Sequence, residues 1–342
     1  NTRKDVSLAP YGLISRTGTP DILGFYILHE GLIGVFDEVL KEVDYSDLRD
    51  EGVQRQATTG GWLGITDKYW LAALIPDQQS KLETSFNAGR RGNLDLYQAD
   101  YLAPPIIAKP GGVMETTNRL FAGAKEVTIL DQYETDHDIA RFDLAVDFGW
   151  FYWLTKPIFY MLVWLNERLG NFGLSILALT VMIKLVFFPL ANKSYASMAK
   201  MKAVQPQLAA LKDKYPDDKM KQQQEMMEIY KKEKINPIAG CLPILIQIPV
   251  FFSLYKVLFV TIEMRHAPFF GWIKALSAPD PTNLFNLFGL LAFDPTQLPV
   301  LGHYLHLGIW PIIMGIEHEN IHTETSSAIF RQVPTDMIAP DD

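Results

Sequence analysis

One lysine lies inside a long apolar run, and its position is the first sign of chemistry in this sequence. Residues 172–190 carry no charge except Lys184. An ammonium group at the centre of a membrane helix costs about 2.5–3.5 kcal/mol, so it usually faces a water-filled cavity or an anionic partner. The alternative is that the long side chain extends to the membrane surface, and position alone does not decide between the two.

Two uncharged polar residues accompany this lysine. Thr180 lies one helical turn before Lys184 on the same face. Gln247 lies midway along a second apolar run, residues 240–262, where its amide requires a hydrogen-bond partner. Taken together, the three residues predict a polar surface between helices.

No motif for covalent chemistry accompanies them. The sequence has no P-loop, no G-x-S-x-G and no H-E-x-x-H. Its one cysteine, Cys241, excludes an internal disulfide, and no combination of Cys and His predicts zinc. The net charge of −8 and the acids interleaved with the lysines argue against nucleic-acid binding. We therefore expect no catalytic residue, metal or cofactor.

The two apolar runs, 172–190 and 240–262, are the elements that must position these residues. Each is long enough to cross a bilayer core of about 30 Å as a helix. A buried helix of a soluble protein is the alternative for either run alone. Two such runs in succession favour membrane spans.

The segment between the runs, residues 191–239, is rich in lysine and predicts a helical hairpin. We expect one helix at about 192–213 and another at about 219–235. Pro216 disfavours a continuous helix, and Asp217 or Asp218 can cap the second one. Because short lysine-rich loops remain in the cytoplasm, we expect the hairpin on that side.

Residues 148–168 concentrate aromatic side chains, which prefer the boundary between membrane and water. Trp150, Trp153 and Trp164 lie there, and Lys156 interrupts the run. We interpret the segment as an amphipathic helix in the plane of the membrane, with a spanning helix as the alternative. The first interpretation puts the preceding residues outside the cytoplasm, and the second puts them inside.

The first 145 residues show short alternating runs separated by turn residues, which predicts an antiparallel β sandwich. Residues 33–36 are an example of such a strand, whereas residues 80–92 are polar and predict a loop. Trp62, Tyr69 and Trp70 are candidates for stacking against a ligand, but we expect them in the core of the sandwich.

Several motifs resemble the YidC/Oxa/Alb family of membrane protein insertases. KMKAVQPQ at 200–207, EMMEIYKKEKINPIAGCLP at 225–243 and LIQIPVFFSLY at 245–255 resemble the conserved domain of its bacterial members. GGWLGITDKYWLAALIPDQ at 60–78 resembles the periplasmic domain of Gram-negative members, a β super-sandwich. The segment before residue 307 resembles alphaproteobacterial members. The resemblance covers about residues 10–315.

The resemblance implies a hydrophilic groove in the membrane that helps other proteins to insert and fold. In it Lys184, where many bacterial members carry arginine, attracts an acidic substrate tail, Thr180 contacts the incoming helix, and Gln247 faces the groove. The cytoplasmic hairpin receives substrates through lysines that we expect to include Lys200, Lys202, Lys212, Lys214, Lys231 and Lys232.

The implied location is the bacterial inner membrane, as a multi-pass protein with its β domain in the periplasm. The implied partners are nascent membrane proteins, membrane lipid, the Sec translocon, the signal recognition particle pathway and the ribosome. No nucleotide is needed, because the apolar substrate segment gains free energy on entering lipid. We therefore expect no enzyme activity.

The predicted fold is an incomplete α-helical insertase core preceded by an all-β periplasmic super-sandwich. On the resemblance we expect the family's first anchor and last spans to be absent, so we do not expect the chain by itself to insert proteins. The apolar stretch that starts at His306 is too short to cross a bilayer. The predicted parts are a periplasmic domain at 1–147, an interfacial helix at 148–170, an insertase core at 171–315 and a polar tail outside the family pattern at 316–342.

Two other functions remain as alternatives. A membrane-anchored periplasmic binding protein would have an aromatic-lined ligand pocket within the first 145 residues. A solute transporter would show an inverted repeat or paired interrupted helices, and the sequence shows neither.

Overall fold

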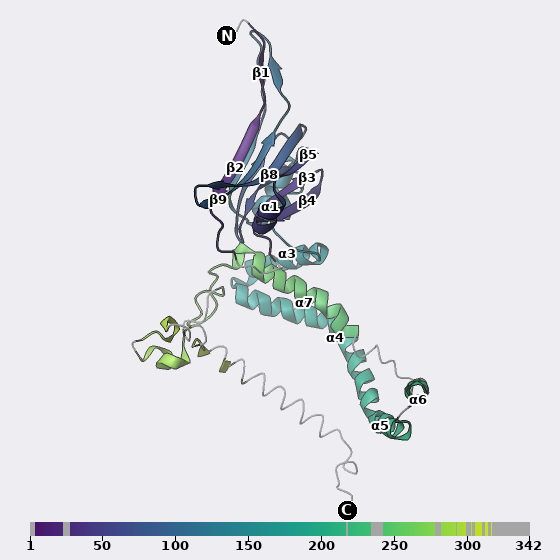
Figure 1. Cartoon of the computed structure of the whole chain (residues 1–342). Helices are drawn as coiled ribbons and strands as arrows, with labels where there is room; N and C mark the ends of the chain where they lie inside the picture. Colours follow the sequence, from purple (N-terminus) through teal and green to yellow (C-terminus); the bar gives the residue numbers. More distant parts are fainter. Residues whose placement is uncertain are drawn as a thin grey trace, which may run out of the picture. The chain divides into compact units, whose positions relative to one another are not determined.

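Short runs of alternating or continuous apolar side chains form the strands of the N-terminal region in the computed structural model (Figure 1). The structure describes residues 4–22, 28–216, 218–233, 242–277, 282–291, 293–298, 302, 305–309, 312, 313 and 316. The chain forms two units, Asn1–Met264 and Arg265–Asp342.

The strands of the first unit form two larger antiparallel sheets and one short antiparallel pair. A four-stranded sheet has the order β2-β9-β8-β5, and a five-stranded sheet has the order β11-β7-β6-β3-β4. The strands are β1 (Val6–Leu8), β2 (Tyr11–Thr17), β3 (Gly31–Phe36), β4 (Val39–Asp44), β5 (Gln54–Thr59), β6 (Trp62–Thr66), β7 (Trp70–Ile75), β8 (Lys81–Arg91), β9 (Leu94–Leu102), β10 (Ile106–Ala108) and β11 (Arg119–Ala124). Strands β1 and β10 make the separate pair.

The two larger sheets pack face to face, which confirms the predicted β sandwich. Leu32 and Leu63 of the five-stranded sheet share one buried cluster with Leu82, Phe86 and Tyr97 of the four-stranded sheet. Burial of this apolar surface between the sheets is what holds them together.

Strand β3 is buried along its whole length because the five-stranded sheet is covered on both faces. Leu32 and Phe36 point into the sandwich, while Ile33 and Val35 point to a second cluster on the other face. Alternate side chains of a strand point to opposite faces, so a strand between two layers reads as continuously apolar.

The predicted loop at 80–92 is wrong, since these residues form β8, which pairs with β5 and β9. Leu82, Thr84 and Phe86 point inward and are buried, whereas Lys81 and Glu83 are exposed. The polar residues that suggested a loop are the outward half of a half-buried strand.

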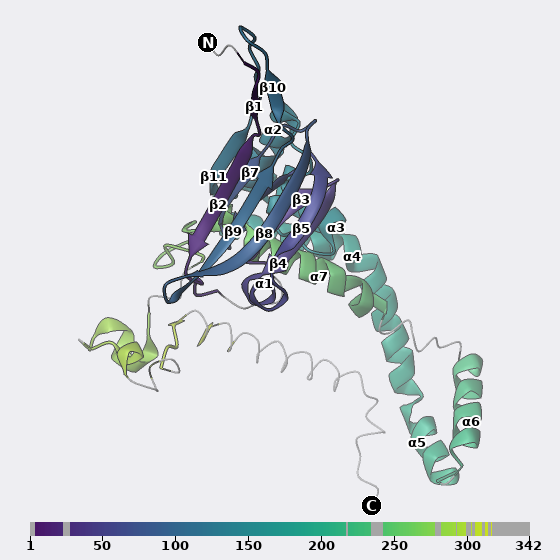
Figure 2. The same cartoon turned by 45° about the horizontal axis from the view of Figure 1, so that its top comes forward.

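The helices follow the strands along the chain, except for α1, which lies between β4 and β5. They are α1 (Tyr45–Glu51), α2 (Val127–His137), α3 (Tyr152–Leu169), α4 (Phe172–Ala203), α5 (Gln205–Lys214), α6 (Lys219–Lys232) and α7 (Leu242–Val260), with short 3₁₀ turns including η1 (Phe142–Ala145) and η3 (Ile262–Met264). Figure 2 shows α4 and α7 beside each other, and both contact α3.

One buried cluster joins the outer face of the five-stranded sheet to these helices. Trp62 of β6 packs edge-on against Phe142, at 5.4 Å between ring centroids. The same cluster includes Phe159 of α3, Leu179 of α4 and Val257 of α7. The β domain and the three helices therefore share one hydrophobic core.

Helix α4 continues beyond the predicted span, and the separate helix predicted at 192–213 is wrong. Asn171 caps its start by accepting from the backbone N–H of Leu174 at 3.1 Å. The helix runs without a break to Ala203. The break comes next to Pro206, which lacks the N–H that a continuous helix would donate and lies in the first turn of α5.

Helix α6 begins where the sequence predicts. The side chain of Asp218 accepts from the backbone N–H of Lys221 at 3.0 Å, which confirms the predicted cap. The predicted end of this helix, at 235, lies outside the described residues.

Among the described residues, one helix, Phe172–Ala203, is long and apolar enough to cross a membrane. Residues Leu245–Val260 of α7 form a shorter apolar helix, and the first residues of the predicted second span lie outside the described part of the chain. Helix α3 is not among these candidates, and its placement in the membrane plane stays a prediction.

The second unit contains the short 3₁₀ helices η4 (Leu284–Gly289) and η5 (Pro295–Gln297). The apolar stretch that starts at His306 is described only in part. Of the predicted tail at 316–342, only Ile316 lies within the described residues.

One buried lysine of the β domain costs the fold stability. Lys125 is 3% exposed, and its ammonium donates to the Thr66 hydroxyl at 2.8 Å. Burial lowers the pKa of Lys125 to about 8. Between about pH 8 and the ordinary lysine pKa near 10.5, the unfolded chain therefore binds more protons than the folded one. Stability rises with pH across this window.

We expect Lys125→Met to raise the free energy of unfolding at pH 7 by about 1–3 kcal/mol. Removing the buried charge stabilises the fold by on the order of 3 kcal/mol, and losing the hydrogen bond to Thr66 destabilises it by about 1 kcal/mol. The gap between variant and parent should close from pH 8 to 10.5, as measured by thermal unfolding in detergent. Exposed Lys81→Met is the control, and a gap that is independent of pH would contradict this account.

Candidate functional site

The predicted groove residues on α4 lie on one face of that helix. The side chain of Lys184 is exposed, and among the described residues its ammonium makes no ion pair or hydrogen bond. The hydroxyl of Thr180 donates to the carbonyl of Ile176 at 2.8 Å, which satisfies it within its own helix. The lysine is thus the group on this face that is available to a ligand.

Gln247 lies at a similar depth on the neighbouring helix. Lys184 is 12 residues from Phe172, and Gln247 is 13 residues from Val260. At 1.5 Å per residue, both lie roughly 18–20 Å from these helix ends. The start of α4 and the end of α7 lie together in Figures 1 and 2, so both residues lie at about the same distance along their helices from this common end.

Lys184, Thr180 and Gln247 do not form a single cluster among the described residues. The side chain of Gln247 is exposed, like that of Lys184. The cavity described below is lined by other residues. The arrangement offers a cation and an amide on adjacent helices, and a groove between them stays a prediction.

Of the six predicted substrate-recruiting lysines, the structure places Lys200 and Lys202 in the last turn of α4 and the other four on the hairpin of α5 and α6. The side chains of all six predicted substrate-recruiting residues, Lys200, Lys202, Lys212, Lys214, Lys231 and Lys232, are exposed. Val204 and Leu211 are buried beneath them. Lys214 and Lys221 lie 5.1 and 4.9 Å from the ring centroid of Tyr215.

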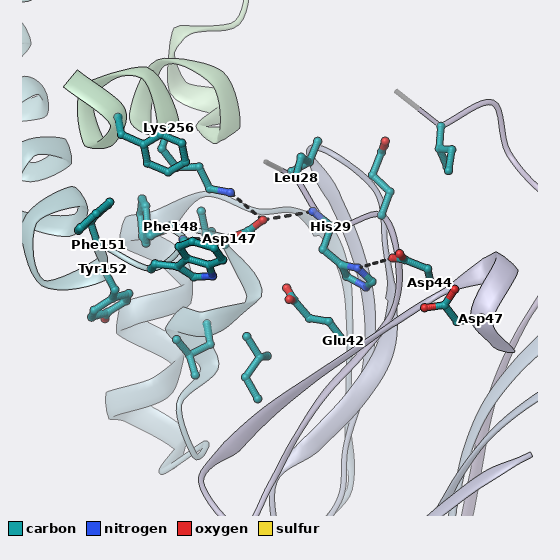
Figure 3. Close-up of a pocket in the computed structure, with 18 of the residues that line it drawn as sticks. Leu28, His29, Glu42, Asp44, Asp47, Asp147, Phe148, Phe151, Tyr152 and Lys256 are labelled. Atoms are coloured by element: carbon teal, nitrogen blue, oxygen red, sulfur yellow. Dashed lines mark hydrogen bonds and ion pairs between the residues drawn. The ribbon is translucent and has the colours of Figure 1, made fainter. Parts of the chain in front are cut away.

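A second lysine in an apolar helix is buried and paired (Figure 3). Lys256 of α7 is 3% exposed, and its ammonium lies 2.8 Å from a carboxylate oxygen of Asp147. The same carboxylate accepts from the backbone N–H groups of His29 at 3.2 Å and Gly149 at 3.0 Å. This ion pair ties the end of the β domain to a helix of the apolar core.

Gly149 makes room for that pairing. Its φ is +70°, and a Cβ there would lie 3.3 Å from Cε of Lys256. A side chain at position 149 would therefore adopt a strained backbone and press against the lysine.

Sequence reasoning missed this pair, although a signal was present. Lys256 is a charge inside the run 240–262, which is the feature that drew attention to Lys184. Such a charge calls for a partner, and Asp147 lies at the boundary where the polar N-terminal region ends. Only the fold brings the two together.

A cluster of carboxylates in the β domain is occupied by a lysine. Oxygens of Asp131, Glu134 and Asp143 lie within 4.8 Å of one another. The ammonium of Lys156 lies 3.0 Å from Asp131 and 2.9 Å from Asp143. This ammonium takes the place that a metal ion would need.

Two of the three aromatic residues that could have indicated a ligand pocket in the β domain lie in opposite environments. Trp62 is 1% exposed and donates from its indole N–H to the carbonyl of Ala140 at 3.1 Å, so it belongs to the core as predicted. Trp70 is 52% exposed, and its prediction as a core residue is wrong. It is the first residue of β7, paired with Ala124, where the sheet leaves its side chain uncovered.

Sequence comparisons agree with this arrangement. The family described as 60Kd inner membrane protein matches residues 164–330, past the predicted start of the tail, and the YidC periplasmic domain matches residues 1–161. The membrane protein insertase YidC of Bradyrhizobium diazoefficiens is 60% identical over 320 residues, which is 91% of this chain and 52% of that protein. The corresponding protein of Beijerinckia indica is 58% identical over 318 residues, which is 92% of this chain and 52% of that protein.

The chain spans about half the length of the curated relatives it matches. A solved structure titled "Active YidC insertase crystal structure with the first transmembrane domain resolved" is 20% identical, with a TM-score of 0.34, covering 73% of this chain and 67% of that one. The two family matches together extend over both the β domain and the helices, which confirms the resemblance. The chain belongs to the YidC family of membrane protein insertases.

Proposed function

We propose that this chain acts, in its full-length protein, as a membrane protein insertase and folding chaperone of the bacterial inner membrane. The observation that carries the proposal is the exposed ammonium of Lys184, which has no partner among the described residues and lies in the apolar stretch 172–190 of α4. A group that is this costly to leave in hydrocarbon fits a hydrated groove that awaits an anionic partner. The relatives' name, membrane protein insertase, supports the same activity.

The proposed mechanism is electrostatic capture followed by partition. A substrate carboxylate about 4 Å from the ammonium gains roughly 4 kcal/mol at an effective dielectric constant of 20. Thr180 and Gln247 line the path of the polar segment, which shortens its passage through hydrocarbon. The adjacent apolar segment then enters lipid and supplies the driving free energy. No covalent step and no nucleotide is involved.

The hairpin receives substrates on the cytoplasmic side. Its exposed lysines favour contact with acidic surfaces and anionic lipid headgroups. We propose nascent membrane proteins as substrates, with the Sec translocon, the signal recognition particle pathway and the ribosome as partners. The interfacial helix α3 then places the β domain in the periplasm.

A chimera tests the proposed function. Residues 1–316 would replace the matching region of the Bradyrhizobium relative, and the product would be expressed in cells depleted of their own insertase. We expect growth and membrane insertion of a reporter to be restored to near the level of the unmodified relative. A chimera that accumulates folded in the membrane without restoring either would refute the proposal.

The orientation of the hairpin gives a separate prediction. Ala209 of α5 is exposed, so a cysteine introduced there in the chimera should react with a small thiol reagent when it has access. In intact cells, a reagent that cannot cross the inner membrane should leave it unlabelled, and lysis should allow labelling. A cysteine at exposed Asn93 in the β domain is the matched control and should label in intact cells. Labelling at 209 before lysis would contradict the topology.

A further inference from the structure

A cavity of about 820 Å³ lies between the β domain and the helices (Figure 3). Its β-domain wall comes from β4 and the first turn of α1, and its helical wall comes from α7. The connection between η1 and α3 closes the space between these walls. The paired residues Asp147 and Lys256 lie at its edge.

The helical wall of this cavity is apolar apart from Lys256, whose ammonium pairs with Asp147. Ile248, Phe252 and Lys256 follow one another at intervals of four residues on α7 and so form one stripe. The ring of Phe151 packs against Phe252 at 5.9 Å between centroids. Trp150, which is 94% exposed, also lines the cavity and is the type of residue found at a membrane boundary.

The β-domain wall is acidic. Glu42, Asp44 and Asp47 line it. Asp44 accepts from the ring of His29 at 3.1 Å, and Asp47 accepts from Ser46 at 3.3 Å. The lysine of the cavity is already engaged by Asp147.

Glu42 is the acid that remains available. Among the described residues its carboxylate makes no hydrogen bond and no ion pair, and Figure 3 shows it pointing into the space between His29 and Asp147. Desolvation raises the pKa of Glu42. Repulsion from Asp147 raises this pKa further, whereas His29 lowers it. A cation placed beside it would relieve both effects.

We propose that this cavity binds one zwitterionic phospholipid whose headgroup ends in an ammonium group. The ammonium lies against Glu42 and Asp44, and one acyl chain lies along Ile248 and Phe252. The apolar wall on α7 matches the acyl chain of such a lipid, and the acidic wall on the β domain matches its ammonium group. Anionic headgroups without an ammonium would meet the carboxylates and be repelled. The inference rests on the placement of α7 in the membrane and not on insertase activity.

Native mass spectrometry of the delipidated full chain in detergent tests this proposal. Phosphatidylethanolamine and phosphatidylglycerol with identical acyl chains would be titrated separately, with phosphoethanolamine as the headgroup alone. We expect phosphatidylethanolamine to bind about tenfold more tightly than phosphatidylglycerol, as one charge-assisted contact implies. The headgroup alone should bind weakly, because it lacks the chain that contacts α7.

Variants separate the two walls. Glu42→Gln should remove the preference for phosphatidylethanolamine, while Glu83→Gln, at an exposed position of β8, should keep it. Ile248→Trp should weaken the binding of both lipids, because the larger side chain fills the apolar side of the cavity. Thermal unfolding would confirm that each variant is folded. Equal binding of the two lipids by the parent chain, or an unchanged preference in Glu42→Gln, would overturn the proposal. Insertion is not measured here, so this failure would leave the proposed function untouched.

Discussion

Lys184→Ala in the chimera is expected to reduce insertion of substrates with acidic tails by at least tenfold. The physical reason is the loss of roughly 4 kcal/mol of attraction at an effective dielectric constant of 20, part of which the substrate recovers from water. Because the lysine is exposed and has no partner in the part of the chain that the structure describes, its removal should not destabilise the fold. The measurement is growth rescue together with protease protection of an inserted reporter.

Lys184→Arg is the matched control for this prediction. Arginine keeps the charge and adds a planar fork of donors, so insertion should remain close to that of the parent. A reporter whose tail lacks acidic residues should be affected little by either substitution. Equal insertion of the acidic reporter by the alanine variant and the parent would remove Lys184 from the mechanism.

The second large effect is expected at the ion pair between the β domain and α7. Lys256→Met should lower the free energy of unfolding by about 3–5 kcal/mol, since it leaves the carboxylate of Asp147 without its cation. The backbone donors of His29 and Gly149 would still hold that carboxylate in place. The loss should appear in thermal unfolding of the detergent-solubilised chain and as faster proteolysis between residues 147 and 152.

A double-mutant cycle isolates the pair. Asp147→Asn with Lys256→Met removes both charges, and the double variant should be more stable than either single variant. Lys231→Met, at an exposed position of the hairpin, should change stability by less than about 0.5 kcal/mol. Additive losses in the cycle would mean that the two residues do not act as a pair.

Local periodicity accounts for what could be predicted. Alternation of period two predicted the β sandwich, and continuous apolar runs predicted the helices around Lys184 and Gln247. The cap at Asp218 was also readable, because an N-cap needs only one side chain and the N–H groups of the next turn. Each of these signals is complete within a short stretch of chain.

The sequence by itself determined the β sandwich, the apolar helices and the place of Lys184 within one of them. Only the tertiary structure decided that β8 is a strand, that Trp70 is uncovered, and that Asp147 meets Lys256. Burial and charge pairing depend on which surfaces meet, and residues far apart in the chain supply those surfaces. The acidic cavity exists for the same reason, since its two walls come from β4 and α7.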